Sequence, residues 1–335
     1  MMSALFDPAR HEPHHIQGWN EVAAREAIVE ITRSAISAFE PGRGWRAHPL
    51  DEPKPPSHRF YNLYFGAGGV VWALRYLARQ GATDDPPRFE PFVGTLREAN
   101  RPLLQDGQHG TASYLFGDSG LDLLDWTLRP DAAVAQRLFD TVQGNLHNPV
   151  REALWGNAGT VLAAIHMAES TGEARWISLV RDAADALQAE MELDSKTGTW
   201  LWVQNLYGRP ATRFIGAGHG FAGNVYPFLR ARALLPCEQV ALVMDRALAT
   251  LQVTSLRVDG GANWFPGINP QRPASWLPLV QDCHGAPGIV CRLAAAPRTP
   301  QWDGRHSLWT GDIGLACLLW SSVMCDDHFP TLDLF

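Results

Sequence analysis

The stretch QDCHGAPGIVCRL, residues 281–293, places a cysteine and a histidine directly before two spaced glycines and an apolar run. Cys283 and His284 come first, Gly285 and Gly288 form a G-x-x-G pattern, and the apolar residues after them predict the body of a helix. The first backbone N–H groups of a helix have no partner within it and lie at the positive end of its dipole. We therefore expect this position to favour a thiolate or another anion.

The same glycine pattern recurs along the chain, which indicates a repeat protein. The first glycines of the six copies are Gly66, Gly117, Gly156, Gly220, Gly285 and Gly311. Segments directly after the glycines, such as residues 70–74 and 313–320, are apolar nearly all round and predict buried helices. Amphipathic segments lie between the copies, at 134–146, 176–187 and 240–251.

Buried helices alternating with amphipathic ones predict an all-α fold, an α/α toroid (a barrel of inner and outer helices) that forms one domain over residues 1–335. Residues 1–19 are expected to form a tail. Asn20 is expected to cap a helix that runs to about residue 39. Residues 40–60 are rich in proline and predict an ordered or lid-like loop, and TWLWVQN, residues 199–205, predicts a short hairpin.

Composition limits the kinds of partner. A net charge of -7 with no run of like charges argues against nucleic acid or an anionic membrane as partner. The chain has five cysteines, no apolar run long enough to cross a bilayer and no leader-like segment at Met1, so we expect a cytoplasmic protein with reduced thiols and no transmembrane segment.

In a toroid the inner helices run parallel, so their N-termini converge at one end and the residues beside the glycines line a shared pocket. These residues are Asp118, Glu152, His219, Cys283, His284 and Asp312. Asp118 and Asp312 are interpreted as helix caps or hydrogen-bonded core residues. His219 and Cys283, which are flanked by glycines, are interpreted as functional.

Several of these copies together resemble the lanthionine synthetase C-like (LanC-like) family. GAGHGFAG (216–223) and CHGAPG (283–288) look like its signature motifs, and NLYFGAGG, YLFGDSG, EALWGNAG, SLWTGDIG and FPTLDLF extend the similarity from about residue 62 to residue 335. GANWFPGINP (261–270) leads toward the CHGAPG copy much as in the eukaryotic-type members.

The resemblance implies a toroid of seven inner and seven outer helices and a zinc-dependent addition of a cysteine thiol to a dehydroalanine or dehydrobutyrine in a peptide. It implies a zinc ion held by two cysteines and a histidine, of which Cys283 matches the first cysteine. His219 matches the residue assigned to proton transfer, a role that suits an imidazole. Glu152 matches a supporting acidic residue. Implied partners are a peptide substrate or small thiol, and a partner modification enzyme.

The chain departs from the family's pattern at its last copy. Gly311 follows Gly285 by only 26 residues and its motif resembles the family's seventh, so one repeat is missing and six inner helices are expected. If the copy is instead the sixth, Trp309 and Thr310 stand where a cysteine and a histidine belong. Cys283 is then the only retained zinc ligand, and Asp282 stands where the family usually has an aromatic residue.

No cofactor is therefore expected, and zinc only with substitute ligands drawn from His284, His306, Cys317, Cys325 and His328. Three hypotheses stay open. One is a thiol-addition enzyme with a degenerate zinc site, in which His219, Glu152 and His284 are catalytic and Asp118, Asp282, Asp312 and Trp309 bind substrate. The second is a non-catalytic protein that binds a peptide or a partner enzyme, and the third is a sugar-processing α/α-barrel enzyme that uses paired carboxylates.

Overall fold

The computed structural model describes residues 5–7, 9, 18–51, 54–55, 57–104, 110–206, 211–268, 277–281, 283–286, 306–326, 328 and 330–335. The chain divides into two compact units. The first unit is Met1–His14 with Phe139–Ala295, and the second unit is His15–Leu138 with Ala296–Phe335. The described residues are mainly helical, so the predicted all-α class is confirmed.

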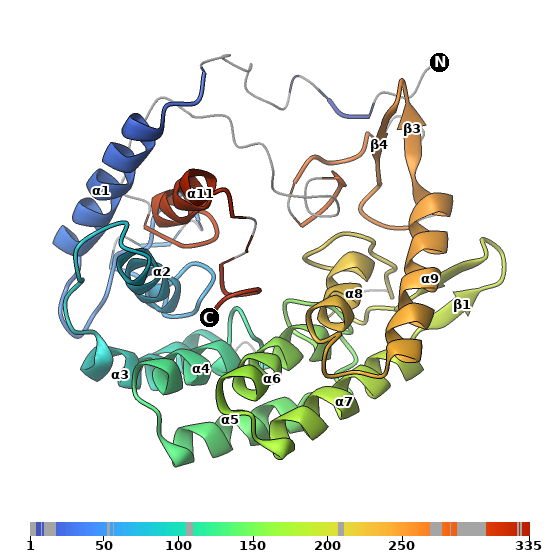
Figure 1. Ribbon diagram of the computed structural model, residues 1–335, viewed down its shortest axis with the longest axis horizontal. Helices are drawn as coiled ribbons and strands as arrows, with labels where there is room; N and C mark the ends of the chain where they lie inside the picture. Colours follow the sequence, from blue (N-terminus) through green and yellow to red (C-terminus); the bar gives the residue numbers. More distant parts are fainter. Residues whose placement is uncertain are drawn as a thin grey trace. The chain divides into compact units, whose positions relative to one another are not determined.

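The second unit is built from helices of widely separated sequence. They are α1 (Glu21–Ser37), α2 (Ala67–Arg79), α3 (Glu90–Asn100), the short 3₁₀ helix η2 (Arg101–Leu104), α4 (Asp118–Leu128) and α11 (Asp312–Met324). Helix α11 packs against both α1 and α2 (Figure 1), which brings the last repeat beside the first. Asn20 caps α1 as predicted, because its side chain accepts a hydrogen bond from the N–H of Ala23 at 3.1 Å.

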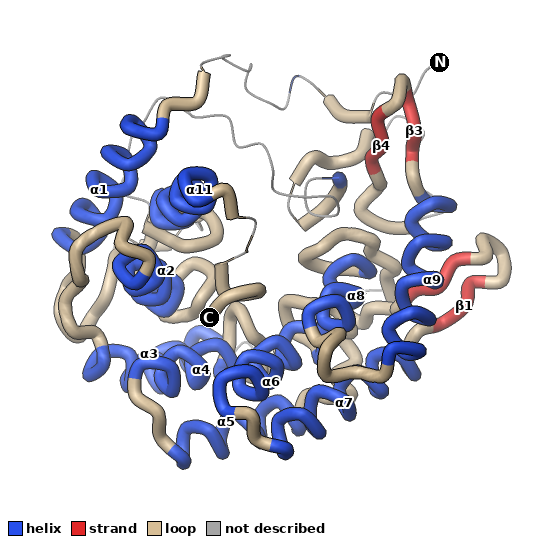
Figure 2. Tube along the Cα trace, in the orientation of Figure 1, coloured by secondary structure: helices blue, strands red, loops and turns tan. Residues whose placement is uncertain are grey.

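The first unit is also mainly helical and contains two hairpins. Its elements are α6 (Asn157–Thr171), α7 (Ala174–Ala189), β1 (Glu192–Asp194), β2 (Thr199–Leu201), α8 (Phe221–Arg230), α9 (Cys237–Thr254), β3 (Leu256–Val258) and β4 (Gly261–Asn263), while α5 (Ala132–Gly144) contains the boundary between the units. Strand β1 pairs antiparallel with β2, and β3 with β4, as Figure 2 shows in red. The hairpin predicted from TWLWVQN lies earlier in the chain than expected, because Thr199–Leu201 is its second strand and Glu192–Asp194 its first.

Burial separates the two kinds of helix as the sequence predicts. In α6 every residue from Asn157 to Ala168 is buried, whereas α7 buries one stripe that includes Trp176, Val180 and Leu187. Helix α11 differs from the prediction, because Leu318 and Leu319 are only half-buried.

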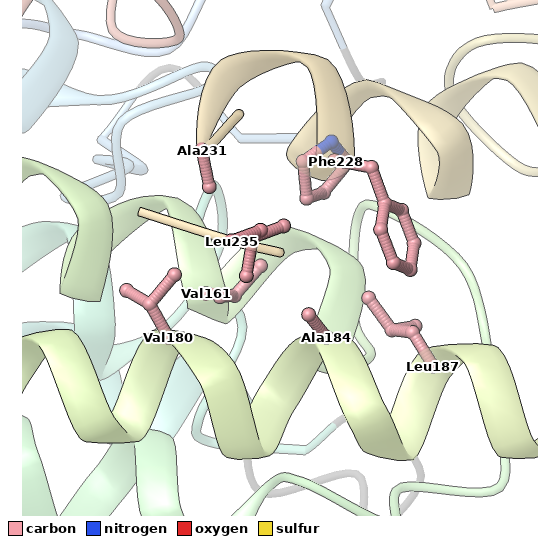
Figure 3. Close-up of a pocket in the computed structure, with 8 residues that line it drawn as sticks. Val161, Val180, Ala184, Leu187, Phe228, Ala231 and Leu235 are labelled. Atoms are coloured by element: carbon pink, nitrogen blue, oxygen red, sulfur yellow. The ribbon is translucent and has the colours of Figure 1, made fainter. Parts of the chain in front are cut away.

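The junction of α6, α7 and α8 shows how tightly the first unit packs (Figure 3). Val161 from α6, Val180 and Leu187 from α7, and Phe228 from α8 are among the eight apolar residues around it, and the gap they leave is too small for a water molecule. Apolar contacts at this density hold the helices that carry the site residues.

The G-x-x-G pattern begins helices in the way the sequence predicts. Gly66, Gly117, Gly156, Gly220 and Gly311 are the N-cap residues of α2, α4, α6, α8 and α11. For the copy at Gly285 only residue 286 of the following helix is described. The 26-residue interval from Gly285 to Gly311, on which the missing repeat rests, lies mostly outside the described residues.

The reason for the glycines is the loop that precedes each helix. A Cβ atom on Gly69 would lie 2.1 Å from the carbonyl oxygen of Leu63, and one on Gly223 would lie 2.1 Å from that of Ala217. In both motifs the chain six residues earlier crosses directly over the first helical turn. Only glycine permits this approach.

Where the loop crosses the first turn of the helix, its carbonyl groups accept hydrogen bonds from the first N–H groups of the helix, which were expected to be unpaired. At α2, the N–H groups of residues 67, 68 and 69 donate to the carbonyls of residues 60, 61 and 62. At α8, residues 221, 222 and 223 donate to residues 214, 215 and 216. The first N–H groups of these helices are therefore bonded to protein carbonyls, and they are not a ready-made anion site.

No helix among the described residues is long and apolar enough to cross a membrane. The described part of the proline-rich segment 40–60 contains no helix, and it begins with a bridge between Glu40 and Gly44.

Candidate functional site

A buried carboxylate and a half-exposed imidazole meet in the first unit. Glu152 lies in the loop before α6 and His219 in the loop before α8, and their Oε2 and Nδ1 atoms are 3.0 Å apart. The Glu152 side chain is fully buried, whereas that of His219 is 31% exposed. The pair therefore has one end anchored in the core and one end open to a ligand.

The other oxygen of Glu152 is also engaged, because its Oε1 accepts the N–H of Trp155 at 2.6 Å. Burial raises the pKa of Glu152 above its usual value, while the hydrogen bond and charge of His219 lower it. An ionised carboxylate can only accept hydrogen bonds. When Glu152 is ionised, Nδ1 of His219 must therefore carry the hydrogen, which leaves Nε2 for chemistry.

A second histidine lies against the first. The rings of His219 and His284 are nearly parallel, with centroids 5.6 Å apart, and Phe214 packs against His284 at 5.5 Å. Burial, and then the charge of His219, lower the pKa of His284 to about 4, so His284 is neutral at pH 7. Its buried Nδ1 atom has no hydrogen-bond partner among the described residues.

Glycines in the GAGHGFAG motif make room for Cys283. A Cβ atom on Gly216 would lie 2.0 Å from the carbonyl oxygen of Cys283, and one on Gly218 would lie 2.8 Å from its Cβ atom. The N–H of Gly218 donates to that same carbonyl at 3.4 Å. The half-buried thiol of Cys283 lies 3.8 Å from Oε1 of Gln281. The two signature motifs are therefore in direct backbone contact.

One buried asparagine holds the segment that carries Cys283 and His284. Asn263, at the end of β4, accepts the N–H of Ala286 at 2.7 Å and donates to the carbonyl of Leu279 at 3.2 Å. Its side chain thus spans both ends of the segment. The first N–H of the helix that begins at residue 286 is consequently bonded to Asn263.

Phe214, Asn263 and Gln281 are the residues at this site that sequence reasoning missed. Asn263 belongs to GANWFPGINP, whose only signal was its place before the CHGAPG copy. Phe214 lies seven residues before the first residue of α8, and its carbonyl accepts the first N–H of that helix. The seven-residue spacing between loop and helix is therefore the signal that could have identified Phe214. Gln281 is a neighbour of Cys283 in sequence and carried no signal of its own.

Three other predicted residues belong to the second unit. Asp118 is the first residue of α4, and its Oδ2 atom forms an ion pair with Arg97 at 2.8 Å. Trp309 stacks on Tyr64 with ring centroids 5.7 Å apart. Asp312 is the half-buried first residue of α11. The predicted residue Asp282 lies outside the described residues.

If the last copy is the family's sixth motif, Thr310 stands where the family has a histidine that binds zinc. Its hydroxyl donates a hydrogen bond to Asp51 and lies 2.6 Å from the hydroxyl of Ser307. These hydroxyls fasten the proline-rich loop to the last motif. The hydroxyl groups of Thr310 and Ser307 are not preferred ligands of zinc, which takes cysteine, histidine and carboxylate groups.

The resemblance to the family implies a zinc ion held by three protein side chains. Within the described ranges, no three His, Cys, Asp or Glu side chains are gathered closely enough to hold a metal ion. Gly216, Gly218 and Gln281 are among the residues that lie against Cys283, and none of them is a usual zinc ligand. The described residues do not fit a three-ligand zinc site.

The comparison with protein families agrees with the motifs. The family described as lanthionine synthetase C-like protein matches residues 131–306, which include Glu152, His219 and Cys283. No curated protein matches the chain. Among solved structures the chain is similar to nisin cyclase, with 13% identity over 92% of this chain and 77% of that chain and a TM-score of 0.49.

The alternation of buried and amphipathic helices and the resemblance to this family predict the same fold, an α/α toroid. The family match covers more than half of the 335 residues. The chain belongs to the lanthionine synthetase C-like family.

Proposed function

We propose that this protein binds a peptide and adds a thiol to a dehydroamino acid in it, with His219 and Glu152 as its proton-transfer pair. The observation that carries the proposal is the 3.0 Å contact between a fully buried carboxylate and a half-exposed imidazole. Family membership supports a peptide as the substrate and a cyclase-like modification as the reaction class.

The reaction needs one proton to be moved. Nε2 of neutral His219 takes the proton of the attacking thiol, and the sulfur forms a bond to the β-carbon of the dehydroamino acid. The electron pair of the carbon–carbon double bond moves to the α-carbon and its carbonyl as an enolate. The imidazolium then returns the proton to the α-carbon, so atoms and charge balance and His219 is regenerated.

Glu152 and His284 assist without touching the reacting atoms in this scheme. Ionised Glu152 accepts the Nδ1–H of His219 and stabilises the imidazolium while it exists. His284 stays neutral at pH 7, so it stacks on His219 without adding a second positive charge. Its unpartnered Nδ1 atom offers a hydrogen-bonding position for the peptide.

The test is turnover of a dehydroalanine peptide with a small thiol, followed by mass spectrometry. We expect saturable rates, and His219→Ala lowers them about 10²–10⁴-fold because it removes general acid–base catalysis. Glu152→Gln keeps the size of the side chain but removes its charge, and lowers the rate by a smaller factor. His147→Ala is the matched control, because His147 is an exposed histidine of the same unit and its removal leaves the rate unchanged.

A rate that His219→Ala and His147→Ala affect equally contradicts the proposed role of His219. Peptide binding without turnover, under conditions where the variants are folded, favours the non-catalytic alternative.

The metal content of the protein distinguishes a thiol-addition enzyme that uses zinc from the two alternatives without a metal. Zinc is expected to bind only if substitute ligands are recruited. One zinc per chain that is lost in Cys283→Ala, measured by mass spectrometry of the purified protein, supports a rearranged site. Sugar hydrolysis is not favoured, because both oxygens of Glu152 are already hydrogen-bonded to protein groups.

A further inference from the structure

The second unit contains a cavity that no step of the proposed reaction uses. It lies at the C-terminal halves of α2 and α4, where Trp72, Tyr76, Leu124 and Leu128 form much of its wall, together with Leu334 and Phe335. Its volume is about 140 Å³. A dry protein cavity of about 150 Å³ is large enough to hold benzene, so this cavity has room for one six-membered ring.

The apolar part of the wall is preformed. Trp72 and Leu124 are almost fully buried, with 5% and 1% of their surface exposed. The rings of Trp72 and Tyr76 stack with centroids 5.1 Å apart and an angle of 9° between their planes. Because these side chains are held by their own helices, a ligand ring would not have to order them.

Two arginines supply the charged part of the lining, beside the neutral side chains of Gln80 and Thr127. Arg75 and Arg79 are one turn apart on α2, and no acidic side chain of the described residues lines the cavity. Arg75 reaches Glu90 at 3.5 Å, the limit of a hydrogen bond, and its buried Nε atom has no partner among the described residues. Nothing in the described part of the chain pairs with Arg79 by an ion pair or a hydrogen bond.

Arg79 lines the cavity as an exposed side chain, so its guanidinium group is accessible to a ligand from solution. Burial, and then the charge of Arg75, lower the pKa of Arg79. Glu90 pairs with Arg75, which leaves Arg79 available to a bound anion, and a monoanion suits one available cation better than a dianion does.

We propose that this cavity binds a small monocarboxylate with an aromatic or branched apolar body. The carboxylate lies between Arg75 and Arg79, where the planar guanidinium groups can each donate two hydrogen bonds, and the body lies on Trp72 and Leu124. The proposal does not depend on the thiol-addition activity, since all the residues named belong to the second unit and the proton-transfer pair belongs to the first.

Benzoate is the probe, because its ring matches the cavity and its carboxylate matches the arginines. Binding to the full chain is measured by nuclear magnetic resonance titration, beside benzyl alcohol and benzylamine as neutral and cationic compounds of similar size. We expect saturation with a Kd of about 1 mM for so small a ligand. Benzyl alcohol binds about tenfold more weakly, and benzylamine does not bind.

Variants locate the binding. Arg79→Met removes the charge but keeps a long side chain, and weakens benzoate binding about tenfold. Arg33→Met is the matched control, because Arg33 is an exposed arginine on α1 of the same unit, and it leaves the Kd unchanged. Leu128→Trp fills the cavity and abolishes binding. Circular dichroism checks that each variant is folded, and Arg75→Met replaces Arg79→Met if the latter is not.

Three results overturn the proposal. The first is no saturation at concentrations about twentyfold above the expected Kd. The second is equal binding of benzoate and benzyl alcohol, which would leave no role for the arginines. The third is displacement of benzoate by inorganic phosphate at similar concentrations with no effect of Leu128→Trp, which would indicate a surface anion site without an apolar part.

Discussion

Gly69→Ala tests the explanation given for the glycine repeats. Gly69 is the third residue of α2, and an added Cβ atom would lie 2.1 Å from the carbonyl oxygen of Leu63 and 2.9 Å from the Cβ atom of Leu308. Contacts under 3.0 Å essentially never occur for real Cβ atoms. The loop must therefore move by about 1 Å away from the helix to admit a methyl group.

That movement strains three backbone hydrogen bonds. They join the N–H groups of residues 67, 68 and 69 to the carbonyls of residues 60, 61 and 62, at 3.0, 3.1 and 3.4 Å. At about 0.5–1.5 kcal/mol each, their loss costs about 1.5–4.5 kcal/mol. Alanine is preferred over glycine in a helix by about 1 kcal/mol, which offsets part of this loss. We expect Gly69→Ala to lower the free energy of unfolding by about 0.5–3.5 kcal/mol.

Gly94→Ala is the matched control. Gly94 lies inside α3 of the same unit, and its added Cβ atom would meet only the end of the Arg129 side chain at an ordinary 3.4 Å. Helix preference alone then acts, and we expect the free energy of unfolding to rise by about 0.5–1 kcal/mol. Guanidinium unfolding followed by circular dichroism measures both variants.

The reasoning is refuted if Gly69→Ala is as stable as the wild type or more stable, because the loop crossing would then impose no requirement for glycine. It is also refuted if the two variants lose stability equally, since the loss would then come from something other than the close approach at α2.

Three further predictions concern other parts of the chain. Asn263→Ala removes hydrogen bonds at both ends of the segment that carries Cys283. We expect this change to lower the free energy of unfolding by about 2–4 kcal/mol and to speed deuterium exchange at residues 279–286. An unchanged exchange rate contradicts the prediction. Hydrogen bonds from Arg46 and then Arg59 lower the pKa of Glu40 in the folded protein. The stability that ionised Glu40 contributes is therefore present above pH 4.5 and is lost as the pH falls through the lowered pKa of the folded state. The difference in unfolding free energy between the wild type and Glu40→Gln should shrink as the pH is lowered, and growth of that difference contradicts the prediction. Burial raises the pKa of the Cys317 thiol, so a thiol reagent in mildly alkaline buffer should modify exposed Cys325 in the folded protein and reach Cys317 only after unfolding, as peptide mass mapping would reveal.

Much of the helical framework could be predicted from the sequence because its signals are local. Asn20 caps α1 through a residue only three positions away. The apolar stripe of α7 follows the helical repeat, so Trp176, Val180 and Leu187 could be placed on one buried face without any tertiary information. Motif spacing also placed the N-terminus of α8 at Gly220.

The candidate site could be predicted only as a set of residue types near helix N-termini. Glu152 and His219 are 67 residues apart, and no local rule gives the distance between their side chains. The structure also shows that residues of the loops, not free helix N–H groups, surround Cys283. Asn263 is the clearest example, because its role comes from a segment that folds back onto it 16 and 23 residues later.

The sequence by itself determined the family, the all-α class and the positions where most helices begin, because glycine spacing and apolar periodicity act over a few residues. Only the tertiary structure decided that Glu152 is fully buried, that His284 lies against His219, and that the loops cross the first turns of their helices. The physical reason is that desolvation and ring contacts arise between segments distant in sequence, and packing alone brings those segments together.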